Sequence, residues 1–152
     1  MLYQERRVPD MKLNAVTLGV TDFARSVPFY EDLGFQRRHK ATGDAVAFFD
    51  AGGMVLSLFR WDELADDAQI APAPPPQSFR GTTLAQLCRT DAEVDALMSK
   101  ALCAGATLLK HAQKTSYGGY SGYFADPNGH VWEAVRAPGF KFRRNGQVKL
   151  PD

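Results

Sequence analysis

Glu133 is the residue whose type and position most directly indicate chemistry. It stands in the run VWEAV (131–135), in which the other four residues are all apolar. An ionised carboxylate in apolar surroundings is unfavourable, so such a group is paired, bound to a metal or used as an acid or base. The DPNG run at 126–129 has the composition of a type I turn. This turn predicts that Glu133 lies on the returning strand of a β-hairpin.

Three interpretations of Glu133 follow from the residues alone. Its carboxylate can be satisfied by the hydroxyl groups of Ser57 or Thr83, by a tyrosine or by an arginine. It can act as a pocket base that takes a proton from a carbon acid, while the two hydroxyl groups orient a substrate oxygen. It can also anchor a ligand without taking part in chemistry.

The elements that must position Glu133 occur twice in the chain. Alternation, capping residues and glycine stops predict a strand, a helix and three further strands in each half. The first copy comprises residues 14–20, 22–33, 35–40, 44–50 and 54–59. The second comprises residues 83–88, a helix that follows the capping box at 90–93, residues 106–110 and the hairpin at 119–135.

The repeat determines which residues of the two copies correspond. A shift of 76 residues places Asp50 on Asp126 and Ser57 on Glu133. We therefore predict an α+β fold in which two βαβββ modules form one cupped sheet with the helices on the outside. Ser57 and Glu133 then lie near the centre of the cup.

The first strands correspond under a shift of 68 residues, which places Ala15 on Thr83, or on Leu84 if the register differs by one residue. The inward positions near the centre are thus Ala15, Ser57, Thr83 and Glu133. Within one structural domain, the predicted parts are the first module (11–62), a Pro-rich connection (63–80), the second module (81–137) and a tail (138–152).

We expect the cup to hold a small organic molecule. A glycine-rich strand with tyrosines suits a flat, apolar ligand, and aromatic packing in a twisted strand is the alternative explanation of the same pattern. The expected lining comprises Ala15, Thr17, Phe48, Ser57, Phe59, Thr83, Tyr120, Tyr123 and Glu133, to which Trp61 can add apolar surface. His39, His111 and His130 have no spaced partner, and alternation places His130 on the face opposite Glu133.

Two stretches carry a resemblance to a known family. LGVTDFARSVPFYEDLGF (18–35) and GYFADPNGHVWEAV (122–135) resemble the vicinal oxygen chelate superfamily, and the similarity extends from about residue 12 to residue 137. This superfamily includes glyoxalase I, extradiol dioxygenases, methylmalonyl-CoA epimerase and the bleomycin- and fosfomycin-resistance proteins. Its fold is therefore expected here, whereas the scaffold hosts many chemistries.

The resemblance also locates the metal ligands of the family. Its metalloenzymes place one ligand in the first strand and one in the last strand of each module, which are the four inward positions. Only Glu133 matches, because alanine cannot ligate and neutral hydroxyl groups are poor ligands for zinc, iron or nickel. A catalytic divalent ion needs about three protein ligands. We therefore expect a degenerate metal site and no cofactor, with a divalent metal bound through Glu133 as the alternative.

These observations favour a metal-independent small-molecule-binding protein. The alternatives are a lyase or isomerase of the glyoxalase type, in which Glu133 is the catalytic acid–base or a metal ligand, and a non-catalytic structural or regulatory dimer with a filled cup. A net charge of +1 argues against nucleic acid as a partner. No apolar run approaches the ~20 residues that span a bilayer. We expect a cytoplasmic protein, and the resemblance implies a homodimer.

Overall fold

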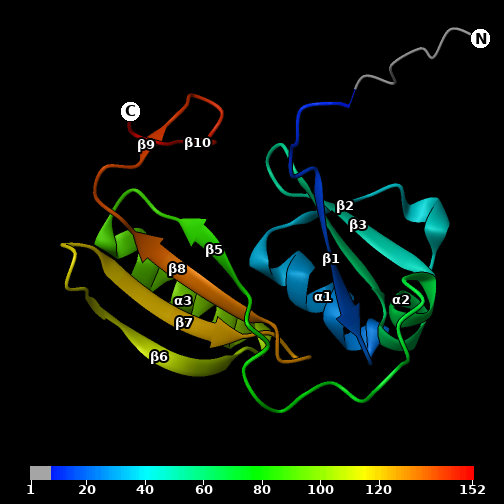
Figure 1. The fold of residues 1–152 in the computed structure, drawn as a ribbon. Coiled ribbons are helices and arrows are strands. Elements are labelled where there is room, and N and C mark those ends of the chain that lie inside the picture. Colours follow the sequence, from blue (N-terminus) through cyan, green and yellow to red (C-terminus); the bar gives the residue numbers. More distant parts are fainter. Residues whose placement is uncertain (1–7) are drawn as a thin grey trace, which may run out of the picture.

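The computed structural model describes residues 8–152 and contains two βαβββ modules (Figure 1). The first comprises β1 (Ala15–Val20), α1 (Phe23–Leu33), β2 (Gln36–Arg38), the 3₁₀ turn η1 (Lys40–Thr42), β3 (Val46–Asp50) and β4 (Val55–Arg60). Helix α2 (Trp61–Asp67) and a Pro-rich connection follow. The second module comprises β5 (Thr83–Leu87), α3 (Asp91–Ala104), β6 (Thr107–Lys114), β7 (Tyr120–Ala125) and β8 (Val131–Arg136). The tail forms a hairpin of β9 (Lys141–Phe142) and β10 (Val148–Lys149). The predicted α+β fold of two βαβββ modules is confirmed.

Each module has its own four-stranded sheet. The strand orders are β1-β4-β3-β2 and β5-β8-β7-β6, and in both sheets the first strand pairs in parallel with the last. Among residues 8–152, no strand ladder joins the two sheets. The single cupped sheet of the prediction is thus divided into two, because β1 and β5 are the unpaired edges of separate sheets.

The strand register identifies the corresponding residues in the first strands. Ala15 pairs with Val55, and Thr83 pairs with Val131. These pairs are equivalent under the predicted shifts of 68 (83 − 15) and 76 (131 − 55) residues. Thr83 is therefore the counterpart of Ala15, and the alternative Leu84 is excluded.

The hairpin turns of the two modules differ in length. Asp50 pairs with Val55 in the first hairpin, whereas Ala125 pairs with Val131 in the second. The second turn is therefore one residue longer. The predicted correspondence of Asp50 with Asp126 is wrong: Asp50 corresponds to Ala125, and the added residue lies within the turn at 126–130.

Local signals explain where the two long helices begin and end. The Asp22 side chain accepts a hydrogen bond from the backbone at the start of α1. At the start of α3, the Thr90 side chain accepts from the Glu93 N–H, and the Glu93 carboxylate accepts from the Arg89 N–H, one residue before the N-cap. Gly34 and Gly105 end the helices in the left-handed region, with φ of 108° and 107°.

One aromatic core connects the modules. Helices α1 and α3 contact each other and lie behind the strands β1 and β8 in Figure 1. Tyr30 of α1 is 0% exposed, and its ring contacts Trp132 of β8 and Phe49 of β3. Phe124 stacks on Trp132 with an interplanar angle of 3°. This core covers one face of both sheets. The opposite face, which we call the open face, has no core of its own within residues 8–152 and carries α2 against β1 and β4 of the first sheet.

The alkaline stability of the fold is expected to depend on Tyr30. Burial, followed by the charge of Asp126 and a hydrogen bond to it, raises the pKa of Tyr30 well above its usual value. Above about pH 10 the unfolded chain releases this proton while the folded chain retains it, so the free energy of unfolding falls as the pH rises. Urea unfolding at about pH 9 and about pH 11 measures the slope. Tyr30→Phe should reduce the dependence of the free energy of unfolding on pH, whereas Tyr117→Phe, at an exposed site, should not. An equal slope in the wild type and both variants contradicts the assignment.

Candidate functional site

The open face of the first sheet brings the predicted residues of that module together. Thr17, Ser57 and Phe48 form one row across β1, β4 and β3. Alternation places Ala15 and Phe59 on the same face. The Thr17 Oγ1 and Ser57 Oγ atoms are 2.6 Å apart and hydrogen-bonded. This face thus combines aromatic surface with a hydroxyl pair.

The open face of the second sheet carries Glu133. It lies in a row with Tyr123 of β7 and Lys110 of β6, and Thr83 shares the face by alternation. The Ser121 hydroxyl donates to Glu133 Oε1 at 2.9 Å. Ser121 therefore satisfies the Glu133 carboxylate. Sequence reasoning did not select Ser121, although it lies two residues from Tyr123 and must share its face.

The prediction that Tyr120 belongs to this face is wrong. Tyr120 pairs with Arg136 on the helix-covered side, where it packs against the core. Its hydroxyl donates to Asp95 of α3 at 2.7 Å. Because side chains alternate along a strand, Tyr120 and Tyr123, three positions apart, cannot share one face.

Tyr123 is held in its protonated form beside Glu133. Burial raises the pKa of Tyr123, and the negative charge of Glu133 with a hydrogen bond to it raises this pKa further. A hydrogen bond involving Ser121 acts in the opposite direction. The Tyr123 hydroxyl is therefore a hydrogen-bond or proton donor next to a carboxylate.

Removing the charge of Glu133 should lower the pKa of Tyr123. Glu133→Gln removes the anion that disfavours tyrosinate, whereas Ser121→Ala should raise the same pKa because it removes the opposing hydrogen bond. Ultraviolet titration of tyrosinate, with Tyr123→Phe to identify the transition, measures both shifts. Shifts of the same sign in the two variants would contradict the assignment.

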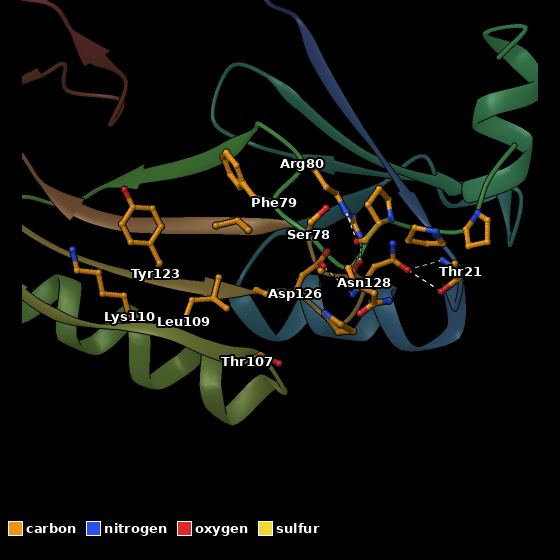
Figure 2. A pocket seen from close by; sticks show the side chains of 18 residues that line it. Thr21, Ser78, Phe79, Arg80, Thr107, Leu109, Lys110, Tyr123, Asp126 and Asn128 are labelled. Carbon is orange, nitrogen blue, oxygen red and sulfur yellow. Dashed lines mark hydrogen bonds between the residues drawn. The ribbon is translucent and has the colours of Figure 1, made fainter. Parts of the chain in front are cut away.

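A pocket of about 890 Å³ lies between the open face of the second sheet and the connection (Figure 2). Lys110 and Tyr123 lie at one end of it, and Thr21 and Asn128 lie at the other. Its volume is within the usual range of ligand pockets, roughly 300–1,000 Å³. Of the predicted lining residues, only Tyr123 takes part.

Arg80 fastens the connection to both modules. Its Nη2 donates to the Asn128 carbonyl at 2.8 Å, and its guanidinium lies 5.1 Å from the centre of the Trp61 ring. His130 Nε2 is 2.7 Å from the Gly19 carbonyl, so this nitrogen carries the proton and donates. His130 Nδ1 then accepts from Arg80 Nη1 at 3.4 Å. We term this group of Trp61, Arg80 and His130 the Arg80 clasp; sequence reasoning gave no role to Arg80.

The described residues do not fit a metal of the family type. The four family positions are Ala15, Ser57, Thr83 and Glu133, and one of them is a carboxylate. Within residues 8–152, no three His, Cys, Asp or Glu side chains come close enough to hold a metal ion together. Neutral hydroxyl groups do not replace the missing imidazole, thiolate or carboxylate ligands.

Comparisons with known proteins agree with this fold. A sequence model of the Glyoxalase/Bleomycin resistance protein/Dioxygenase superfamily matches residues 12–134. The chain is 28% identical to Metallothiol transferase FosB of Lysinibacillus sphaericus (strain C3-41) over 122 residues, which is 80% of this chain and 79% of that protein. A glyoxalase-related enzyme from Fulvimarina pelagi has a similar structure, with a TM-score of 0.83 and 31% identity over 93% of this chain and 99% of that chain. Lactoylglutathione lyase from Agrobacterium tumefaciens shares the fold, with a TM-score of 0.64 and 24% identity over 84% of this chain and 95% of that chain.

Proposed function

Because the chain belongs to the glyoxalase/bleomycin resistance protein/dioxygenase superfamily, we propose that it binds a small organic molecule on the open faces of its sheets without a family-type metal. The donor set carries this proposal: Ala15, Ser57 and Thr83 stand with Glu133 at the four positions that hold metal ligands in the metalloenzymes. One carboxylate falls short of the roughly three protein ligands that a catalytic divalent ion needs.

The residues of the open faces suit ligand binding. Phe48, Phe59 and Tyr123 supply aromatic surface, which gives a flat organic molecule most of its binding free energy. The hydroxyl pair on the first sheet and Glu133 on the second sheet each supply the few polar groups that can orient a ligand on that face. In this proposal Glu133 anchors a donor group of the ligand and Tyr123 donates to an acceptor.

A thermal-shift screen of aromatic and drug-like molecules tests the proposal. We expect at least one compound to raise Tm, because binding to the folded chain alone adds about 2.7 kcal/mol to the free energy of unfolding at a ligand concentration of 100 Kd. EDTA should leave this rise unchanged, since no metal takes part. Phe48→Ala should reduce the shift, whereas Leu102→Ala at an exposed position of α3 should not. A shift that disappears with EDTA and returns with Zn²⁺ or Ni²⁺, or a screen without any hit, contradicts the proposal.

The second candidate is a lyase or isomerase in which Glu133 is the acid–base. The adjacent Tyr123, whose pKa is raised, favours it because a carboxylate beside a protonated hydroxyl can pass a proton to and from a carbon acid. Exchange of the carbon-bound hydrogen of a bound compound with deuterated water measures this step. Glu133→Gln should abolish the exchange without abolishing binding, and unchanged exchange removes the candidate.

The proposed working form is a cytoplasmic homodimer. Helix α2 and the connection cover part of the open faces, and the apolar side chains of Phe79 and Leu109 remain exposed in the larger pocket. Burial of such surface against a second copy is favourable. Cys88 and Cys103 form no disulfide, which suits a reducing compartment. None of the described helices is long and apolar enough to cross a membrane.

Light scattering after size-exclusion chromatography tests the dimer. We expect twice the mass of one chain, and Leu109→Glu should shift the population toward the single chain because it places a charge in the interface. Lys149→Glu, in the exposed tail, is the matched surface control. A single-chain mass across the accessible concentration range contradicts the dimer.

A further inference from the structure

A second pocket lies where the connection crosses the first module. It is bounded by β1, helix α2, the connection and the start of β8, and its volume is about 440 Å³. Its lining includes Thr17, Gly19, Trp61, Leu64, Ala65 and His130. We call it the α2 pocket.

Trp61 and Gly19 shape the wall of the α2 pocket. A Cβ atom at Gly19 would lie 2.9 Å from Trp61 Cε3, so the absence of a side chain lets the indole lie against the strand. The indole N–H donates to the Ala73 carbonyl at 2.6 Å. Trp61 thus links the strand side of the pocket to the connection that covers it, and Arg80 stacks on the same ring.

The lining excludes a charged ligand. It contains no Asp, Glu, Lys or Arg, and its one ionisable residue is His130. Both ring nitrogens of His130 already have protein partners, the Gly19 carbonyl and Arg80. The neighbouring cation, Arg80, is outside the lining and bonds to His130 and the Asn128 carbonyl, so an ion that entered would lose hydration without gaining a free ionic partner in the pocket wall.

One hydroxyl hydrogen is free to serve a ligand. Thr17 and Ser57 bond to each other, and Ser57 is 3% exposed. Two hydroxyl groups carry two hydrogens, and their mutual bond uses one. Among the described residues, neither hydroxyl has a further side-chain hydrogen bond. When Ser57 donates to Thr17, the Thr17 hydrogen can be directed into the α2 pocket, which Thr17 lines.

We propose that the α2 pocket binds a neutral aromatic molecule that carries a carbonyl oxygen, with the ring against the wall formed by Trp61 and Leu64 and the oxygen accepting a hydrogen bond from Thr17. This inference rests on the proposed function, because it assigns a ligand class and a subsite to the open face of the first sheet. It adds a pocket that α2 and the connection build; the larger pocket beside Tyr123 shares only Pro74 and Pro76 of the connection with it.

The matched probes are acetophenone, ethylbenzene and benzoate, which share a ring and differ in the carbonyl and the charge. The chain has two tryptophans, so its two indole N–H signals in a ¹⁵N NMR spectrum report the pocket and the core separately. Acetophenone should shift the Trp61 signal and leave that of buried Trp132 in place. Ethylbenzene should bind roughly 2- to 12-fold more weakly, the range expected for one hydrogen bond, and benzoate should not saturate.

Two variants separate the pocket from other sites. Ala65→Leu fills the α2 pocket and should weaken acetophenone binding at least about tenfold, a loss of the kind that overpacking produces. Asp66→Leu adds the same side chain at an exposed position outside the pocket lining and should leave acetophenone binding unchanged. Thr17→Val should remove the preference for acetophenone over ethylbenzene and leave ethylbenzene binding unchanged.

The outcomes distinguish this inference from the proposed function. Three outcomes overturn the inference: acetophenone still binds the Ala65→Leu variant, benzoate binds as tightly as acetophenone or more tightly, or acetophenone does not shift the Trp61 signal. The proposed function stands in each of these cases if the broader screen gives a chelator-insensitive ligand whose shift depends on Phe48. It fails on its own if that screen gives no such ligand.

Discussion

Replacement of Trp132 by alanine is expected to lower the free energy of unfolding by roughly 3–5 kcal/mol, the usual loss for truncating a buried aromatic side chain. The indole is 8% exposed and stacks on Phe124 within the second module. It also contacts the rings of Tyr30 and Phe35 from the first module, and its N–H donates to the Tyr30 hydroxyl at 3.1 Å. The substitution therefore creates a cavity at the junction of the modules and leaves that hydroxyl with one partner fewer.

Denaturant unfolding of the pure protein measures this loss. Trp132→Phe retains an aromatic ring and should lose clearly less than Trp132→Ala, because it gives up the N–H bond and only part of the volume. Exposed Leu150→Ala is a control for the loss of an apolar side chain outside the core. A loss below about 1 kcal/mol for Trp132→Ala is the size seen at surface sites and would contradict a core shared by the modules.

The fold could be predicted because several local signals agree on it. The capping box at Thr90 and Glu93, the glycine stops at Gly34 and Gly105 and the turn before β8 each act over a few residues. Such signals are properties of the sequence itself. The repeat then related the modules, and the register of Thr83 followed from it.

The open faces were predictable to the extent that alternation was applied. Thr17, Phe48, Ser57, Tyr123 and Glu133 lie on open faces as expected. Tyr120 was placed there against the two-residue period of a strand, and Ser121 was missed although the same period selects it. Residue type alone favours Tyr120 at this face, whereas the two-residue spacing of a strand favours Ser121.

Other features depend on long-range contacts that no local pattern encodes. The Arg80 clasp joins residues 19, 61, 80 and 130, which lie far apart in the sequence. Likewise, β6 runs to Lys114 instead of ending near residue 110, because it follows β7 through two register shifts. The pairing partner sets the length of this strand, and its own composition does not.

Asp126→Ala is expected to lower the free energy of unfolding by roughly 3–5 kcal/mol, as when one partner of a buried charged network is removed. The carboxylate is 3% exposed and accepts three hydrogen bonds. Its Oδ2 accepts from the Tyr30 hydroxyl at 2.7 Å, and its Oδ1 accepts from the backbone N–H groups of Asn128 and His130 at 2.9 and 2.8 Å. Alanine leaves these donors without an acceptor and removes the residue that joins the β7–β8 turn to α1.

Asp126→Asn separates the turn from the junction of the modules. The amide oxygen can still accept from both backbone N–H groups, whereas the amide nitrogen cannot accept from Tyr30. The loss should therefore be smaller than for alanine and also smaller than that of Tyr30→Phe, which in addition removes the acceptor of the Trp132 indole N–H. In the double variant of Asp126→Asn and Tyr30→Phe, the two losses should not add, because both remove the same bond. Full additivity of the two losses would contradict this role, because it would mean that other contacts hold the turn and the helix together. An Asp126→Ala loss no larger than that of exposed Asp152→Ala would contradict it as well.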